Sequence, residues 1–124
     1  MSIEHNILSF SNDAIILREF YGEVSVFDII ESWEMLIRNQ TINGNTLGVI
    51  NDLTHCNLNM NVSSFQTLID YLSKNHLISR LKIAVVTNQP EIMVFPSLGE
   101  VFTASLSIKP FSSKELAILW VSEK

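Results

Sequence analysis

Three residues whose side chains can bind a metal or react lie close together in the sequence: Asp52, His55 and Cys56. They follow an apolar run typical of a buried strand, and ligands of parallel α/β sheets collect at the carboxyl ends of strands. A zinc site needs three or four ligands, and the sequence has no second cluster of His and Cys. A catalytic cysteine needs an oriented base, but adjacent residues of an extended segment point in opposite directions. We therefore predict a polar loop with a partly buried thiol, no catalytic residue, no metal site and no cofactor.

Ser63 is the second candidate, because it stands where a helix is predicted to begin. A phosphate on this serine would place about two negative charges at a helix N-terminus, where the helix dipole favours them. Ser63 and Gln66 also have the spacing of a capping box, in which each side chain bonds to the backbone N–H of the other residue. Capping accounts for this spacing by itself, so we interpret Ser63 as a helix cap.

The other polar residues give no sign of a catalytic group. Glu31 and Glu34 come nearest to a carboxylate pair, but their spacing places them on an exposed helix face. His5 and His76 have no evident acid or base partner. The four glycines are scattered and form no phosphate-binding motif. Since no nucleophile, base and electrophile come together, we do not expect an enzyme.

One apolar segment near residue 92 contains a methionine and is interrupted by a proline and a glycine. Such a segment can form a docking face or the wall of an apolar pocket. It can equally be an ordinary buried connection, and the sequence leaves both interpretations open. The residues expected at the pocket wall are Ile92, Met93, Phe95 and Phe102.

The composition describes a chain that can fold as one domain, residues 1–124. Hydrophobic residues make up 47% and charged residues 17%, which is apolar enough for a real core. Because so little charge is available to cover the surface, some apolar surface is expected to be buried by a protein partner or a second copy in a homodimer.

The charge pattern excludes several partners. The net charge is −5, and no cluster of Lys and Arg occurs, so we expect no nucleic-acid binding. No run of 18 apolar residues is present to span a membrane, and the first residues lack the basic and apolar regions of a signal peptide. Together with a single cysteine, these features lead us to expect a cytoplasmic protein.

The predicted elements alternate along the chain. Two strands joined by a tight turn come first, and a helix capped by Ser25 follows. Each later strand is separated from the next by a helical segment, which implies parallel pairing. The sequence therefore predicts an α/β fold of order β-β-α-β-α-β-α-β-α, with a mixed, mostly parallel sheet and flanking helices. The predicted strands cover residues 6–10, 14–21, 47–53, 81–87 and 106–109, a loop covers 54–62, and helices start near residues 26, 63, 91 and 113.

This order resembles the SpoIIAA-like (STAS) family of bacterial anti-sigma-factor antagonists and their relatives. The resemblance covers nearly the whole chain and is carried by the strand–loop–helix stretch 49–65, the LKIAVVT strand and the turn Lys109-Pro110-Phe111 before the last helix. It implies a single SpoIIAA-like domain.

In the antagonists, a partner kinase phosphorylates one serine of an Asp-Ser-Ser-Gly stretch that opens the helix after the third strand. Ser63 and Ser64 stand at the matching place here, with Val62 in place of the Asp and Phe65 in place of the Gly. What the resemblance carries over is the location: this helix start is the family's usual interaction surface.

Three functions follow as hypotheses. The first is a non-enzymatic regulatory module that binds a protein partner, as the resemblance implies, through Val62, Ser63, Ser64 and Phe65. The second is a module that binds a small apolar ligand or lipid, since the same broad fold is associated with carriers of apolar ligands. The third is a purely structural role. An enclosed apolar cavity under residues 92–102 would favour the second, and an exposed apolar patch near Val62 and Phe65 would favour the first.

Overall fold

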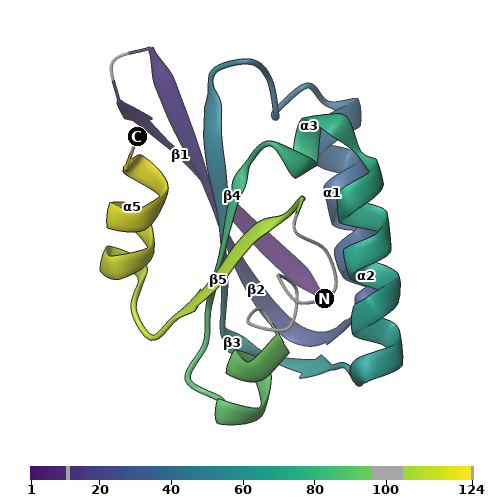
Figure 1. Cartoon of the computed structure of the whole chain (residues 1–124). Helices are drawn as coiled ribbons and strands as arrows, with labels where there is room; N and C mark the ends of the chain where they lie inside the picture. Colours follow the sequence, from purple (N-terminus) through teal and green to yellow (C-terminus); the bar gives the residue numbers. More distant parts are fainter. Residues whose placement is uncertain (11, 96–104, 124) are drawn as a thin grey trace.

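Five strands form one mixed sheet in the computed structural model, which describes residues 1–10, 12–95 and 105–123. Strand β1 (Ser2–Phe10) pairs antiparallel with β2 (Asp13–Ser25). Strands β2, β3 (Thr46–Asn59), β4 (Lys82–Val86) and β5 (Ser107–Phe111) then pair in parallel, in the order β1-β2-β3-β4-β5 (Figure 1). The mixed, mostly parallel α/β sheet is therefore confirmed.

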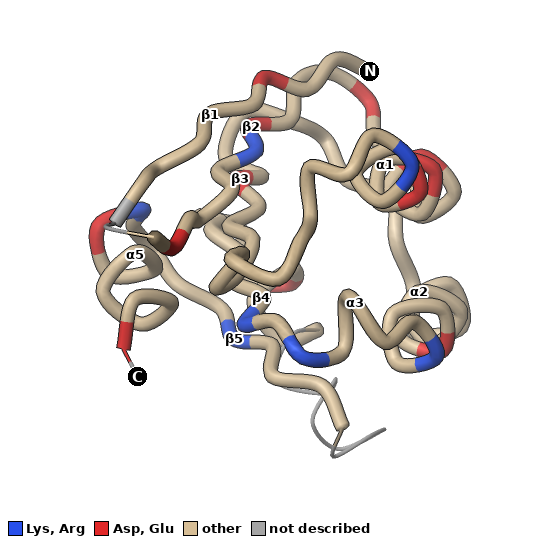
Figure 2. The backbone as a smooth tube through the Cα atoms, turned by 90° about the horizontal axis from the view of Figure 1, so that it is seen from above, with Lys and Arg blue, Asp and Glu red and all other residues tan. Residues whose placement is uncertain are grey.

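The helices cover both faces of this sheet. Helices α1 (Val26–Arg38), α2 (Val62–Lys74) and the short α3 (His76–Ser79) lie on one side, and α5 (Lys114–Ser122) lies on the other (Figure 2). Residues 90–95 are also helical. None of the helices in the described part of the chain is long and apolar enough to cross a membrane.

Alternation along the strands builds a core on each face. On β2, Ile16 and Phe20 face the core under α1 and α2, whereas Ile15 and Leu17 face α5. The α1 side is the larger core, with Trp33 of α1 almost fully buried at its centre. Helix α1 begins as predicted, because Ser25 and Asp28 form a complete capping box.

Two predictions about the middle of the chain are wrong. The predicted loop 54–62 is instead strand up to Asn59, because buried Cys56 and Leu58 alternate there with exposed polar residues. Helix α2 is capped by Asn61, which forms its capping box with Ser64. The predicted box of Ser63 and Gln66 is therefore shifted by two residues.

The predicted turn at residues 109–111 is also wrong, whereas the last helix begins close to its predicted start. Lys109, Pro110 and Phe111 lie inside strand β5 rather than in a turn. A proline is tolerated there because β5 is an edge strand, whose outer N–H groups have no ladder partner to lose. The cap of α5 is Ser113, whose hydroxyl accepts from the backbone N–H of Leu116.

Candidate functional site

Of the four residues at the start of α2 that the sequence predicts to contact a partner, some are exposed and others are not. Val62 is 54% exposed and Ser63 is exposed. The Ser64 hydroxyl is engaged in capping, since it accepts from the Asn61 N–H at 2.9 Å. Phe65 is only 2% exposed and packs in the core, so its ring cannot meet a partner at the surface.

A second exposed apolar side chain, Phe27, lies in the first turn of α1 and is 74% exposed. Helices α1 and α2 start at the same end of the sheet, because Ser25 and Asn59, the last residues of β2 and β3, are register partners (Figure 1). Phe27 and Val62 therefore project from the first turns of neighbouring helices. The sequence pattern does not single out Phe27. It stands beside the apolar residues of α1 that pack in the core, and from the sequence it looks like one of them.

A groove of about 390 Å³ runs between β1 and α1. Ile3 and His5 of β1 form one wall, and Glu31 and Met35 of α1 form the other. Glu31, one of the two carboxylates considered above, thus faces this groove, whereas Glu34 accepts a hydrogen bond from the Tyr71 hydroxyl of α2. The two carboxylates do not act as a pair.

A small apolar pocket lies beside the segment near residue 92. It has a volume of about 50 Å³ and lies between the sheet and the helices of the larger core. Ile92 and Phe95 line it, and the Phe95 ring lies 5.2 Å from that of Phe65. Met93 is half-buried and does not line the pocket, and Phe102 lies outside the described residues. By comparison, the cavity that admits benzene in a model protein is about 150 Å³.

A charged side chain, Arg18, lies fully buried in the core under α1. Its Nε and Nη2 donate to Asn51 Oδ1 at 3.0 and 2.7 Å, and its Nη1 donates to the Ser32 hydroxyl at 2.7 Å. The guanidinium also lies 4.6 Å from the Trp33 ring centroid and 5.0 Å from that of Phe20. All these partners are neutral, and burial lowers the pKa of Arg18 to about 9.

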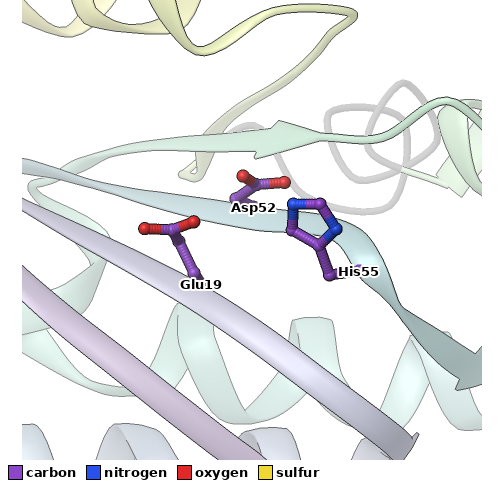
Figure 3. A group of neighbouring side chains, drawn as sticks. All are labelled: Glu19, Asp52 and His55. Carbon is purple, nitrogen blue, oxygen red and sulfur yellow. The ribbon is translucent and has the colours of Figure 1, made fainter.

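Glu19 and Asp52, the next register pair of the same two strands, point to the opposite face. Together with His55 they form a group whose ligand atoms all lie within 4.8 Å of one another (Figure 3). Asp52 and His55 are three residues apart, so regular alternation would place them on opposite faces.

A bulge in β3 explains why these two residues share a face. The register of β2 and β3 slips between the pairs Glu19–Asp52 and Tyr21–His55, so that β3 carries one extra residue. Such a bulge re-aims the side chains that follow it. The sequence prediction placed a loop here and therefore missed both the bulge and the third member of the group, Glu19.

The group has an organised surround. Thr54 donates to Asp52 Oδ1 from its N–H at 2.9 Å and from its hydroxyl at 2.6 Å. The His55 ring stacks on Tyr21 at 5.5 Å with an interplanar angle of 3°. Lys114, the first residue of α5, holds its ammonium 3.7 Å from Glu19 and 3.8 Å from Asp52.

Cys56 is separated from this group, because it points into the core under α1. Its thiol approaches the carbonyl oxygen of Leu53 at 3.5 Å. Burial, and then the negative charges of Asp52 and Glu23, raise the pKa of the thiol to about 11. His55 and Cys56 thus form no catalytic pair, and His76 belongs to another element, at the start of α3.

Comparisons with known proteins identify the fold. No protein-family model matches the sequence, and no curated protein matches it. A crystal structure of an uncharacterised protein of the DUF3478 family from Shewanella loihica, described as having a SpoIIAA-like fold, matches with a TM-score of 0.61 and 16% identity, over 96% of this chain and 93% of that one. The unphosphorylated anti-sigma-factor antagonist SpoIIAA matches with a TM-score of 0.58 and 12% identity, over 98% of this chain and 100% of that one. The chain therefore has the SpoIIAA-like fold.

Proposed function

We propose that this domain is a non-enzymatic protein-interaction module that contacts its partner through the surface at the start of α1 and α2. The observation that carries the proposal is the exposure of Phe27 and Val62 in the first turns of two neighbouring helices. Large apolar side chains gathered at an exposed site are typical of interaction surfaces. One of the two similar structures is an anti-sigma-factor antagonist, and the resemblance described above supports the start of α2 as part of the interaction surface.

Within this surface, Ser63 rather than Ser64 is suited to a regulatory modification. Ser64 holds the helix cap, because its hydroxyl and its backbone N–H both bond to Asn61. Ser63 is exposed in the first turn of α2, where a phosphate would meet the positive end of the helix dipole. Modification of Ser63 would place charge beside Val62 without breaking the cap.

The apolar pocket supports a second candidate function, the binding of a small apolar ligand. Its lining is almost entirely apolar, and Ile92 and Phe95 of the helical segment 90–95 form part of the wall. However, its volume of about 50 Å³ is far below the roughly 300–1,000 Å³ of ordinary ligand sites. A ligand would require segment 90–95 to move outward, so the protein-interaction function has the stronger support.

The test compares partner capture by matched variants. The wild type, a Phe27→Ser/Val62→Ser double variant and a Leu119→Ser control are used for affinity purification from cells of the source organism, with quantitative mass spectrometry. Leu119 is a matched control because it too is an exposed apolar side chain, 63% accessible, but lies on α5. We expect a specific partner that the double variant loses and the control retains.

Light scattering of the same three purified proteins addresses the homodimer. If the partner is a second copy of the chain, the wild type and the Leu119→Ser control will be dimers and the double variant a monomer. Retention of every wild-type partner and of the wild-type mass by the double variant would contradict the proposal. A retained apolar molecule, seen by native mass spectrometry of the wild type, would instead support the second candidate.

A further inference from the structure

We propose that Glu19, Asp52 and His55 form a binding site for a divalent transition-metal ion, with zinc as the metal that fits best. All three ligand atoms lie within 4.8 Å of one another on the face of the sheet that carries α5 (Figure 3). This separation is close enough for small side-chain movements to bring them to one ion. The site is independent of the proposed interaction surface, which lies at the start of α1 and α2.

The donor set selects the metal class. Two carboxylates and one imidazole are common ligands of zinc, which is bound by three protein ligands where the fourth position is left open to water. Magnesium and calcium prefer oxygen ligands alone, so a site that includes His55 favours zinc over both. Carboxylate and imidazole ligands also suit other first-row transition metals, whose affinity for such sites generally follows Mn²⁺ < Fe²⁺ < Co²⁺ < Ni²⁺ < Cu²⁺ > Zn²⁺.

The surroundings hold two of the ligands in place. Asp52 is 2% exposed, and Thr54 fixes its Oδ1 with two hydrogen bonds, which leaves Oδ2 directed toward Lys114. The stacked Tyr21 ring restrains the plane of His55. The bulge of β3 is what turns His55 to this face, and bulges of this kind recur beside functional sites. Outer groups that orient metal ligands in this way are a regular feature of metal sites.

Lys114 occupies the position of a competing cation. Its ammonium lies 3.7 and 3.8 Å from the two carboxylates, which is longer than a charge-assisted hydrogen bond of about 2.8 Å. One ammonium therefore balances two carboxylates from a distance. Its side chain is 40% exposed, so it can swing into solvent when a divalent ion takes its place. The geometry thus predicts that metal and Lys114 compete for the same carboxylates.

The experiment is calorimetric titration of zinc chloride into tag-free protein that has first been stripped with a chelator. We expect one zinc ion per chain for the wild type. His55→Ala removes a ligand from an exposed position and should weaken binding at least about tenfold, the scale on which even outer-shell changes act. Glu19→Gln should weaken it similarly. His76→Ala is the matched control, because His76 lies at the start of α3, and should bind like the wild type.

Lys114→Met tests the competition, since it removes the positive charge and keeps the length of the side chain. We expect it to bind zinc several-fold more tightly than the wild type. Circular dichroism confirms that each variant is folded before titration. Absence of zinc binding by the folded wild type, equal affinity of the wild type and His55→Ala, or magnesium binding as tight as zinc binding would each overturn the proposal.

Discussion

The two faces of the sheet differ in the charged side chains that they carry. On strands β2 and β3, the register pair Arg18–Asn51 faces α1 and the next pair, Glu19–Asp52, faces α5. The first pair encloses a cation among neutral acceptors and aromatic rings in the core. The second pair directs two anions toward a lysine that remains partly exposed. Adjacent positions of one strand thus place a cation inside the core on one face and two carboxylates beside a partly exposed lysine on the other.

The largest effect on stability is expected from breaking the register pair Arg18–Asn51. Asn51→Leu removes the acceptor of two guanidinium N–H groups of Arg18 and leaves the buried cation with Ser32 as its one remaining acceptor among those described. We expect a loss of about 3 kcal/mol in the free energy of unfolding, measured by urea denaturation, because unsatisfied buried charged groups cost at least that much. Asn57→Leu, at an exposed position of the same strand, removes only exposed hydrogen bonds to Glu23 and should change stability by less than about 1 kcal/mol.

The double variant Arg18→Met/Asn51→Leu sharpens this test, since it removes the charge together with its acceptor. Replacing both members of a buried polar pair by apolar groups of similar shape is often neutral or stabilising. The double variant should therefore recover most of the stability lost by Asn51→Leu. A double variant that is less stable than Asn51→Leu would show that Arg18 contributes more than its buried charge costs.

The reactivity of a thiol at position 56 or at position 55 compares the two faces of the sheet, because these adjacent residues point to opposite faces. Since the pKa of Cys56 is raised from 9.0 to about 11, its thiolate fraction at pH 8 should be about 100-fold lower than that of an ordinary thiol. We expect labelling of the folded wild type by a disulfide reagent to be slower by at least this factor than labelling in urea. A His55→Cys/Cys56→Ser variant carries its thiol at an exposed position on the face that carries α5 and should react faster than Cys56 of the folded wild type, because it lacks the burial that is the main cause of the raised pKa of Cys56. Equal rates for the two folded proteins would contradict the assignment of the faces.

A smaller effect on stability is expected from removing the lysine that contacts the register pair Glu19–Asp52. Lys114→Met removes two long ion contacts, one of them to the buried Asp52. Because the ammonium lies 3.7 and 3.8 Å from the carboxylates on a side chain that is 40% exposed, we take its contribution as that of a surface ion pair, at most about 1 kcal/mol. We therefore expect urea denaturation to show a loss below about 1 kcal/mol, decreasing further at high salt. A loss as large as that of Asn51→Leu would mean that this pair, too, is part of the core structure.

The smallest effect concerns His5, the register partner of Arg18 on β1. Burial, and then the charge of Arg18, lower the pKa of His5 below its ordinary value of 6.5. The unfolded chain therefore binds more protons than the folded chain just below pH 6.5, and His5 makes stability fall as the pH falls through that range. NMR titration should show the lowered pKa in the wild type and a value closer to 6.5 in Arg18→Met. An unchanged value in the variant would show that the charge of Arg18 does not reach His5.

The regular parts of the fold were readable from the sequence. Alternation and capping residues predict the first hairpin, α1 and the LKIAVVT strand, because each is governed by local spacing. The extension of β3 to Asn59 was missed, although Cys56 and Leu58 alternate with polar residues, since asparagine-rich segments also favour loops.

The candidate sites were less predictable, because they depend on register. Nothing local to Asp52 and His55 reveals that Glu19 lies opposite or that a bulge aligns all three. In the same way, the burial of Arg18 follows from contacts with Ser32 and Asn51 that are distant in the sequence. Phe27 was missed for the opposite reason, since its exposure is visible only once the helix is docked on the sheet.

The most direct test of the difference between the faces is a two-dimensional ¹H–¹⁵N NMR titration of the wild type with zinc chloride. We expect the amide shifts to change in β2 around Glu19, in β3 from Asp52 to His55 and at the start of α5 around Lys114. Residues of α1 and α2 should be unaffected. Shifts centred on His5, on His76 or on the start of α2, or no shifts at all, would contradict a zinc site on this face.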